Sequence, residues 1–132
     1  MTDYEFLYIV KGICMEIHRR VGCGLLERAY SKILVAKLIE KGFKVSVEVP
    51  ISINYDGIII QDAYRADIIV NNRLIIELKA VENIEKVHYL QLGSYMQLGN
   101  FPLGLLVNFH SANLLEGIHV MKLDTLQKRY HK

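Results

Sequence analysis

The sequence predicts a single α/β domain, residues 1–132, in which helices cover a mixed β-sheet. Hydrophobic side chains recur every three or four residues up to about residue 41, then every second residue from 43 to 55, and form a continuous run at 103–107. With 52% apolar residues in a chain of 132, there is enough material for one core and too little for two. The expected order is two helices, three strands, one helix and one or two strands, without an internal repeat.

The first 41 residues predict two helices joined by a glycine-rich turn. Thr2-Asp3-Tyr4-Glu5 matches a capping box, so the first helix begins there and runs to about Arg20. Gly22-Cys23-Gly24 favours a turn, and the second helix is expected from about Leu25 to Lys41, before Gly42. The residues expected to face the core are Leu7, Val10, Cys14, Ile17, Val21, Leu26, Tyr30, Ile33, Leu34 and Leu38.

Residues 43–80 predict an antiparallel meander of three strands. The alternation at 43–55 indicates a strand with one wet face, and Pro50 places it at a sheet edge or at a bulge. Asp56-Gly57 is a strong hairpin signal, which leads into a second strand at 58–70. A turn at Asn71-Asn72 then leads into the third strand, 74–80.

The length of the second turn decides which side chains share a face of the sheet. A two-residue loop would pair Asp67 with Ile76, and the carboxylates of Asp67 and Glu77 would point to opposite faces. A three-residue loop, 71–73, with an Asn in the left-handed region pairs Asp67 with Glu77 and places both acids and Lys79 on one face. We predict this second register.

The rest of the chain predicts a third helix and the remaining strands. The helix is expected from Glu82 or Asn83 to about Leu98, before Gly99. The apolar run 103–107 suits a strand buried on both faces. We expect an edge strand at 114–123 and a short helix at 124–132.

Composition and motifs exclude several classes of function. The balance of 16 Lys+Arg against 14 Asp+Glu excludes a polybasic binder. Two cysteines make neither a disulfide framework nor a zinc site, and the five histidines lack zinc-ligand spacing. Neither a phosphate-binding glycine loop nor a Gly-x-Ser-x-Gly elbow is present. Without a basic leader or an apolar run of about 20 residues, we expect a cytoplasmic protein that does not enter a membrane.

Asp67, Glu77 and Lys79 are candidates for chemistry. Asp67 lies in a strand that continues into three β-branched apolar residues, although Asp is depleted in strands, and Glu77 and Lys79 share a face of the next strand. Carboxylates on adjacent strands can share Mg²⁺, and a nearby ammonium can neutralise charge at a phosphate. The alternative is an ion pair of Glu77 with Lys79 or Arg65, and these residues alone leave both interpretations open.

Glu27 and Gln91 are further candidates. Glu27 lies in the first turn of the second helix, where the helix dipole alone would favour an acid. Gln91 lies within an otherwise apolar stripe of the third helix, and a buried amide there must find partners. It would bond to backbone if structural, or orient a water or a phosphate oxygen if functional. That stripe contains Ile84, Val87, His88, Gln91, Tyr95 and Leu98.

Gly24-Leu25-Leu26-Glu27-Arg28-Ala29-Tyr30 resembles the Gly-x-x-Glu-x-x-Tyr signature of the GxxExxY family, small bacterial proteins placed in the PD-(D/E)xK nuclease superfamily. The resemblance covers nearly the whole chain and implies a restriction-endonuclease-like αβββαβ core with an extra N-terminal helix. Ala66 stands where the superfamily name has Pro. The other matching segments, in order, are Arg65-Ala66-Asp67, Glu77-Leu78-Lys79-Ala80, Gln91-x-x-Ser94-Tyr95 and Gly104-Leu105-Leu106-Val107-Asn108-Phe109.

The resemblance implies Asp67 and Glu77 as metal ligands with Glu27 as an additional acid, Lys79 as the catalytic lysine and Gln91 as an amide beside the site. The expected function is therefore hydrolysis of nucleic acid, DNA before RNA, by a Mg²⁺- or Mn²⁺-dependent phosphodiesterase. The alternative is a non-catalytic nucleic-acid or protein-binding module, which the near-neutral charge favours. Clustered acids argue against it because they repel phosphate unless a cation intervenes. For a nuclease this small that cuts duplex we expect a homodimer or a helper subunit.

Overall fold

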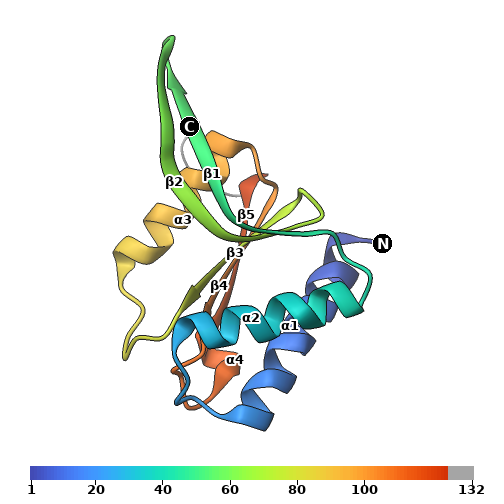
Figure 1. Cartoon of the computed structure of the whole chain (residues 1–132). Helices are drawn as coiled ribbons and strands as arrows, with labels where there is room; N and C mark the ends of the chain where they lie inside the picture. The colour runs from blue at the N-terminus through green and yellow to red at the C-terminus, as the bar shows by residue number, and fades with distance from the viewer. Residues whose placement is uncertain (125–132) are drawn as a thin grey trace.

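The computed structural model describes residues 1–124 and contains one five-stranded mixed sheet in the order β1-β2-β3-β4-β5. Helices α1, α2 and α4 pack on one face of the sheet and α3 packs on the other (Figure 1). β3 and β4 are parallel, and the other neighbouring strands are antiparallel. This is the predicted α/β class. The elements are α1 Asp3–Val21, α2 Glu27–Glu40, β1 Val45–Tyr55, β2 Ile58–Val70, β3 Leu74–Lys79, α3 Lys86–Gly99, β4 Leu103–Asn108, α4 Leu114–Gly117 and β5 Ile118–Lys122.

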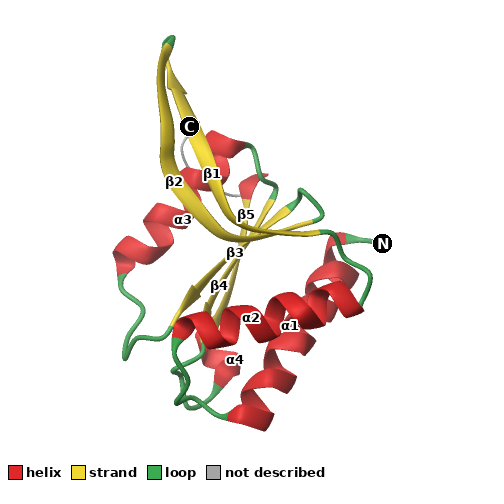
Figure 2. Cartoon of the chain, viewed as in Figure 1, coloured by secondary structure: helices red, strands yellow, loops and turns green. Residues whose placement is uncertain are grey.

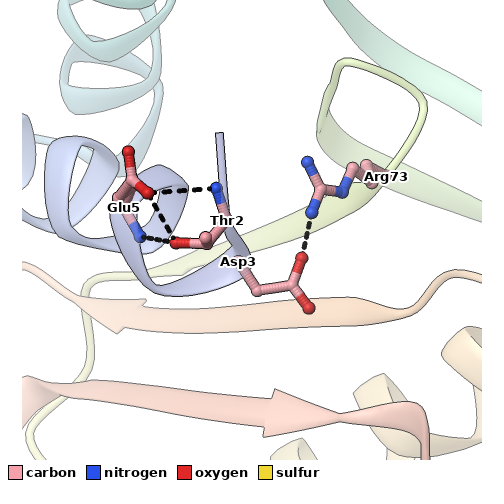
Figure 3. Close-up of polar contacts among 4 residues, drawn as sticks. All are labelled: Thr2, Asp3, Glu5 and Arg73. Carbon is pink, nitrogen blue, oxygen red and sulfur yellow. Dashed lines mark hydrogen bonds and ion pairs between the residues drawn. The ribbon is translucent and has the colours of Figure 1, made fainter.

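The predicted capping box begins α1. The Glu5 N–H donates to Thr2 Oγ1 at 3.1 Å, and the Thr2 N–H donates to Glu5 Oε1 at 3.4 Å (Figure 3). An ion pair between Asp3 and Arg73 joins this helix start to the turn between β2 and β3, and the Arg73 guanidinium lies over the ring of Phe6. The contacts anchor α1 on the sheet.

Two apolar cores lie on opposite faces of the sheet. On β3, Leu74, Ile76 and Leu78 face α1 and α2, whereas Ile75 faces α3. The strand β4 is buried at every position, as its continuous apolar run predicts. Val21 and Leu26 were expected in the core but are exposed, because α1 ends at Val21 and α2 begins only after Leu26. The α1 side chains that are buried are Phe6, Leu7, Val10, Cys14 and Ile17.

The turn between β2 and β3 has the predicted three-residue register. Val70 pairs with Leu74 and Ile68 with Ile76. Asn71 and Asn72 have φ of 54° and 52°, the left-handed conformation that Asn tolerates better than most residues. The side chains of positions 67 and 77 are therefore brought to neighbouring places on the two strands.

The β1–β2 hairpin is long and projects beyond the rest of the sheet (Figure 2). Its two-residue turn has positive φ at Asp56 and Gly57, as the Asp-Gly signal predicts, and Tyr55 pairs with Ile58. The register shifts between Ile51 and Ile53, so the hairpin contains a bulge. β1 is an edge strand, which accommodates Pro50.

Several element boundaries differ from the sequence prediction. α2 begins at Glu27, and α3 begins at Lys86, after Glu85 has capped it. The predicted strand 114–123 was wrong in its first part, because the Asn113 side chain accepts from the Leu115 N–H and begins the short helix α4. The predicted helix 124–132 lies outside the described residues, except for Asp124. Among residues 1–124, no helix is long and apolar enough to cross a bilayer.

Candidate active site

Asp67 and Glu77 meet where β2 and β3 separate. The backbone pairing of these strands ends at Ile68 and Ile76. Beyond it, side chains replace the ladder: the Asp67 N–H donates to Glu77 Oε1 at 3.4 Å, and the Leu78 N–H donates to Asp67 Oδ2 at 2.9 Å. Each carboxylate thus satisfies a backbone donor of the opposite strand, and this exchange holds the two acids together.

β1 and β2 change faces at the same point. Ile68 lies in the core under α1 and α2, whereas Ala66 lies in the core under α3. In a regular strand, positions 66 and 68 would face the same side. Glu48, which lies opposite Asp67 between the pairs Val47–Ile68 and Val49–Ala66, has φ of 50° and marks the distortion.

Glu48 is a candidate site residue that sequence reasoning missed. Together with Glu27 and Asp67 it lines a cleft of about 520 Å³ between α2 and the sheet. Counting back from the two-residue turn without a bulge would place Ser46 opposite Asp67, and the bulge after Ile51 moves Glu48 there instead. The only sequence signal was the acid itself on a strand that was expected to have one wet face.

Tyr64 is a second residue that the sequence did not indicate. Its hydroxyl donates to Glu77 Oε1, and its ring stacks on Tyr95 of α3 with centroids 3.5 Å apart and planes 5° apart. This stack connects the site to α3 across the second core. Tyr64 and the Asp67 N–H donate to the same oxygen of Glu77, which orients that carboxylate.

The environment favours the protonated form of three carboxyls. Burial raises the pKa of Glu77 to about 7, against the lowering effects of the Asp67 N–H and Lys79, and with smaller raising effects of Glu27 and Glu48. Burial also raises the pKa of Asp67, although the Leu78 N–H and Lys79 lower it. The pKa of Glu27 is raised by desolvation and by the charge of Asp67. These acids form one electrostatic cluster.

Lys79 is the cation that interacts with this cluster. Its charge lowers the pKa of each of the three acids. It ends β3 opposite Asn108. The buried Asn108 amide bonds both the N–H and the carbonyl of Val81, which secures the chain just after Lys79. Arg65 pairs with Asp62, and within residues 1–124 neither Asp67 nor Glu77 has an ion-pair partner within 4.0 Å. The ion-pair interpretation of Glu77 was therefore wrong.

Tyr30 holds the start of α2 and hence Glu27. The Tyr30 hydroxyl donates to the Gly22 carbonyl at 2.5 Å and accepts from the Leu25 N–H at 3.1 Å. Its buried ring stacks on Phe109, with centroids 4.3 Å apart. Glu27 itself is exposed at the cleft.

The structure does not place Gln91 in a buried stripe. Its side chain is exposed, as are Val87 and Leu98, whereas Leu92 and Met96 are buried. The physical reason is Gly104 on β4, where a Cβ would clash with Met96 Sδ. This close approach turns the Leu92–Met96 face of α3 onto the sheet. Gln91 lies one helical turn before Tyr95, at the edge of the packed face.

The donor set fits a hard divalent cation. Within the described chain, hydrogen bonds engage only Oδ2 of Asp67 and Oε1 of Glu77, which leaves one oxygen of each carboxylate available. Clustered carboxyls with raised pKa values gain from a cation, and Mg²⁺ commonly takes one or two carboxylates and completes its shell with water. In the arrangement shown for residues 1–124, no three His, Cys, Asp or Glu side chains are close enough to hold an ion by themselves. A divalent cation at this site would therefore be held by two carboxylates, those of Asp67 and Glu77, and by water.

The fold and the site together define a protein of the nuclease class: a mixed sheet between helices, with an Asp on one strand and a Glu-x-Lys on the next. The family model of the PD-(D/E)XK nuclease superfamily matches residues 4–120, and the chain belongs to this superfamily. The restriction-endonuclease-like fold and a nuclease-type function on nucleic acid are thereby confirmed, and members of the superfamily generally use divalent metals. Searches of the curated proteins and of the solved structures found no match.

Proposed function

We propose that the protein is a Mg²⁺- or Mn²⁺-dependent phosphodiesterase that hydrolyses nucleic acid, and that it belongs to the GxxExxY family within the superfamily. The observation that carries this proposal is the pair of hydrogen bonds that joins the two acids beside Lys79: the Asp67 N–H donates to Glu77, and the Leu78 N–H donates to Asp67. Burial of this cluster raises the pKa of both acids. The ionised carboxylates therefore destabilise the metal-free protein, whereas a bound cation would stabilise them.

In this proposal Asp67 and Glu77 hold the ion together with water, and Glu27 is the additional acid at the cleft that Asp67 lines, with Glu48 beside it. A divalent ion bound there supplies Lewis-acid activation of water and of the phosphate. The Lys79 ammonium stabilises the negative charge that develops on the phosphate during attack. Gln91, exposed on α3, is proposed to orient a water or a phosphate oxygen of the bound substrate.

The cleft also suggests where the substrate backbone lies. Arg28 and Lys32 line it on α2, opposite Glu48 and Asp67. Neither forms an ion pair within the described residues, so both are available to phosphates next to the one that is cleaved. We propose that the substrate is DNA rather than RNA. We also propose a cytoplasmic location.

A non-catalytic binding module on the same fold is the second candidate, favoured by the formal charge of only +2. A binding module gains nothing from buried acids with raised pKa values next to the expected phosphate path. The two candidates differ in whether phosphodiester bonds are broken.

The deciding experiment is a cleavage assay on single- and double-stranded DNA and RNA with Mg²⁺, Mn²⁺ or EDTA. The wild type is compared with Glu77→Gln and with Glu116→Gln, a matched substitution of an exposed acid on α4. We expect metal-dependent cleavage that Glu77→Gln abolishes and Glu116→Gln retains. Nucleic-acid binding without cleavage in any metal would support the binding module instead.

A further inference from the structure

The outer part of the β1–β2 hairpin, the arm (residues 52–63), carries an apolar face that none of residues 1–124 covers. Tyr55 pairs with Ile58, and Ile53 pairs with Ile60. Because side chains two residues apart share a face, these four lie together on one side of the ribbon. Tyr55, Ile58 and Ile60 are 68%, 61% and 50% exposed, and no residue of the arm belongs to either core of the described chain.

The arm face continues the row Val49–Ile51 of the α3-side core past the point where the body ends. A two-stranded ribbon is marginally stable in water by itself, and an uncovered apolar cluster on it adds cost. The alternation of apolar residues in the hairpin thus extends beyond the part that residues 1–124 bury, and we infer that another surface covers it.

The same chain has an apolar groove of about 920 Å³ along α1 and α2, which none of residues 1–124 fills. Its floor contains Tyr8, Ile9, Ile13 and Ile33, and Gly12 leaves open space because a Cβ there would meet nothing within 4 Å. Figure 1 shows the arm and the α1–α2 pair at opposite ends of the molecule, so a chain's own arm does not reach its groove.

The charges of the arm and the groove are complementary. Residues 52–62 contain Asp56 and Asp62 and not a single Lys or Arg; Asp62 pairs with Arg65 just beyond the arm, and Asp56 has no ion-pair partner among residues 1–124. On the groove, Glu16 pairs with Arg19 and Lys37 with Glu40, which leaves Arg20 and Lys41 without an ion-pair partner among residues 1–124.

We propose that the arm of one chain docks in the α1–α2 groove of a second copy, and that reciprocal exchange closes a two-fold dimer. Both complementary surfaces are on one chain, so the closed arrangement covers both arms and both grooves. The acidic arm disfavours insertion into nucleic acid. Packing of two arms on each other would bring Asp56 and Asp62 of both copies together and leave the grooves open. The proposal does not depend on the nuclease activity.

The test is sedimentation equilibrium of the full chain, with substitutions on each surface. Ile58→Ser removes an arm-face side chain, and Ile59→Ser is the matched control because Ile59, 64% exposed, lies on the other side of the ribbon. Gly12→Leu fills the groove, and Arg20→Glu reverses its charge. Circular dichroism and thermal melts check that each variant is folded.

We expect a dimer whose dissociation constant rises at least about 10-fold for Ile58→Ser and for Gly12→Leu, and changes less than about 3-fold for Ile59→Ser. Arg20→Glu is also expected to weaken the dimer. A wild type that stays monomeric at its highest soluble concentration would overturn the proposal. A dimer that Ile58→Ser weakens but both groove variants leave intact would also overturn it, in favour of arm-to-arm packing.

Discussion

Asp67 and Glu77 combine a structural role with a proposed chemical one. Their carboxylates accept backbone N–H groups across the gap between β2 and β3, and their pKa values are raised because they are buried near other acids. Amides of similar shape can keep an acceptor oxygen for the backbone while they remove the charge. The cost of the buried charges is thereby separable from the benefit of the hydrogen bonds.

We predict that Asp67→Asn and Glu77→Gln abolish cleavage and preserve or raise the melting temperature in EDTA. The melting temperature is expected to hold because these amides remove buried negative charges that destabilise the metal-free protein. Differential scanning fluorimetry and the cleavage assay measure the two effects. A clear loss of stability with cleavage intact would identify both residues as purely structural.

Tyr64 is predicted to position Glu77 for the metal. Tyr64→Phe keeps the stack on Tyr95 but removes the hydroxyl that donates to Glu77. We expect Mn²⁺ affinity, measured by calorimetry, to fall about 10-fold, as is typical for a residue that orients a ligand. Tyr89→Phe, on the same helix as Tyr95, is the control. Unchanged Mn²⁺ affinity with a lower melting temperature would leave Tyr64 with a packing role alone.

At the scale of elements, the turn between β2 and β3 determines whether the site exists. The three-residue loop sets the register that brings positions 67 and 77 together, and it needs left-handed residues at Asn71 and Asn72. The bulge in the β1–β2 hairpin likewise brings Glu48 opposite Asp67. Both features are local irregularities that select which acidic side chains lie next to Asp67.

We predict that Asn72→Val destabilises the protein by about 1–2 kcal/mol, since a β-branched residue is strained at a φ of 52°. Asn72→Gly is expected to be neutral or slightly stabilising. Urea unfolding monitored by circular dichroism measures both variants. Equal stability of the Val and Gly variants would contradict the importance of the left-handed turn.

At the scale of the whole molecule, the cluster of acids couples folding to metal binding. An ion that binds only the native site stabilises it in proportion to the logarithm of its concentration above the dissociation constant. We predict that Mn²⁺ and Mg²⁺ raise the melting temperature of the wild type and have little effect on Glu77→Gln. The same small response in both proteins would contradict a shared metal site.

Folding is also predicted to depend on pH through Glu77. Its pKa rises from 4.5 to about 7 on folding, so the native state binds the proton more tightly, and the resulting stability is present below pH 4.5 and lost as pH rises through about 7. This shift corresponds to at most about 3 kcal/mol. In EDTA we expect stability to increase from about pH 8 to about pH 6. Urea titrations of the wild type and Glu77→Gln test this, and an identical pH dependence would contradict it.

Much of the fold is encoded locally. The capping box at Thr2, the Asp56-Gly57 hairpin and the apolar run of β4 act through neighbouring residues, and each formed as predicted. The register at Asn71-Asn72 also followed from turn chemistry combined with the alternation of the strands. Asp67, Glu77 and Lys79 were consequently identifiable as candidates from the sequence, although their roles remain proposals.

The tertiary structure decided the rest of the site. Glu48 reaches the cleft because a bulge shifts a strand, and Tyr64 contacts Glu77 because α3 stacks Tyr95 against it. Gln91 is exposed because Gly104, on a different strand, lets the Leu92–Met96 face of α3 approach the sheet. The sequence by itself determined which elements form and in what order, since those depend on neighbours along the chain. Only the tertiary structure decided which faces meet, because that depends on contacts between residues far apart in sequence.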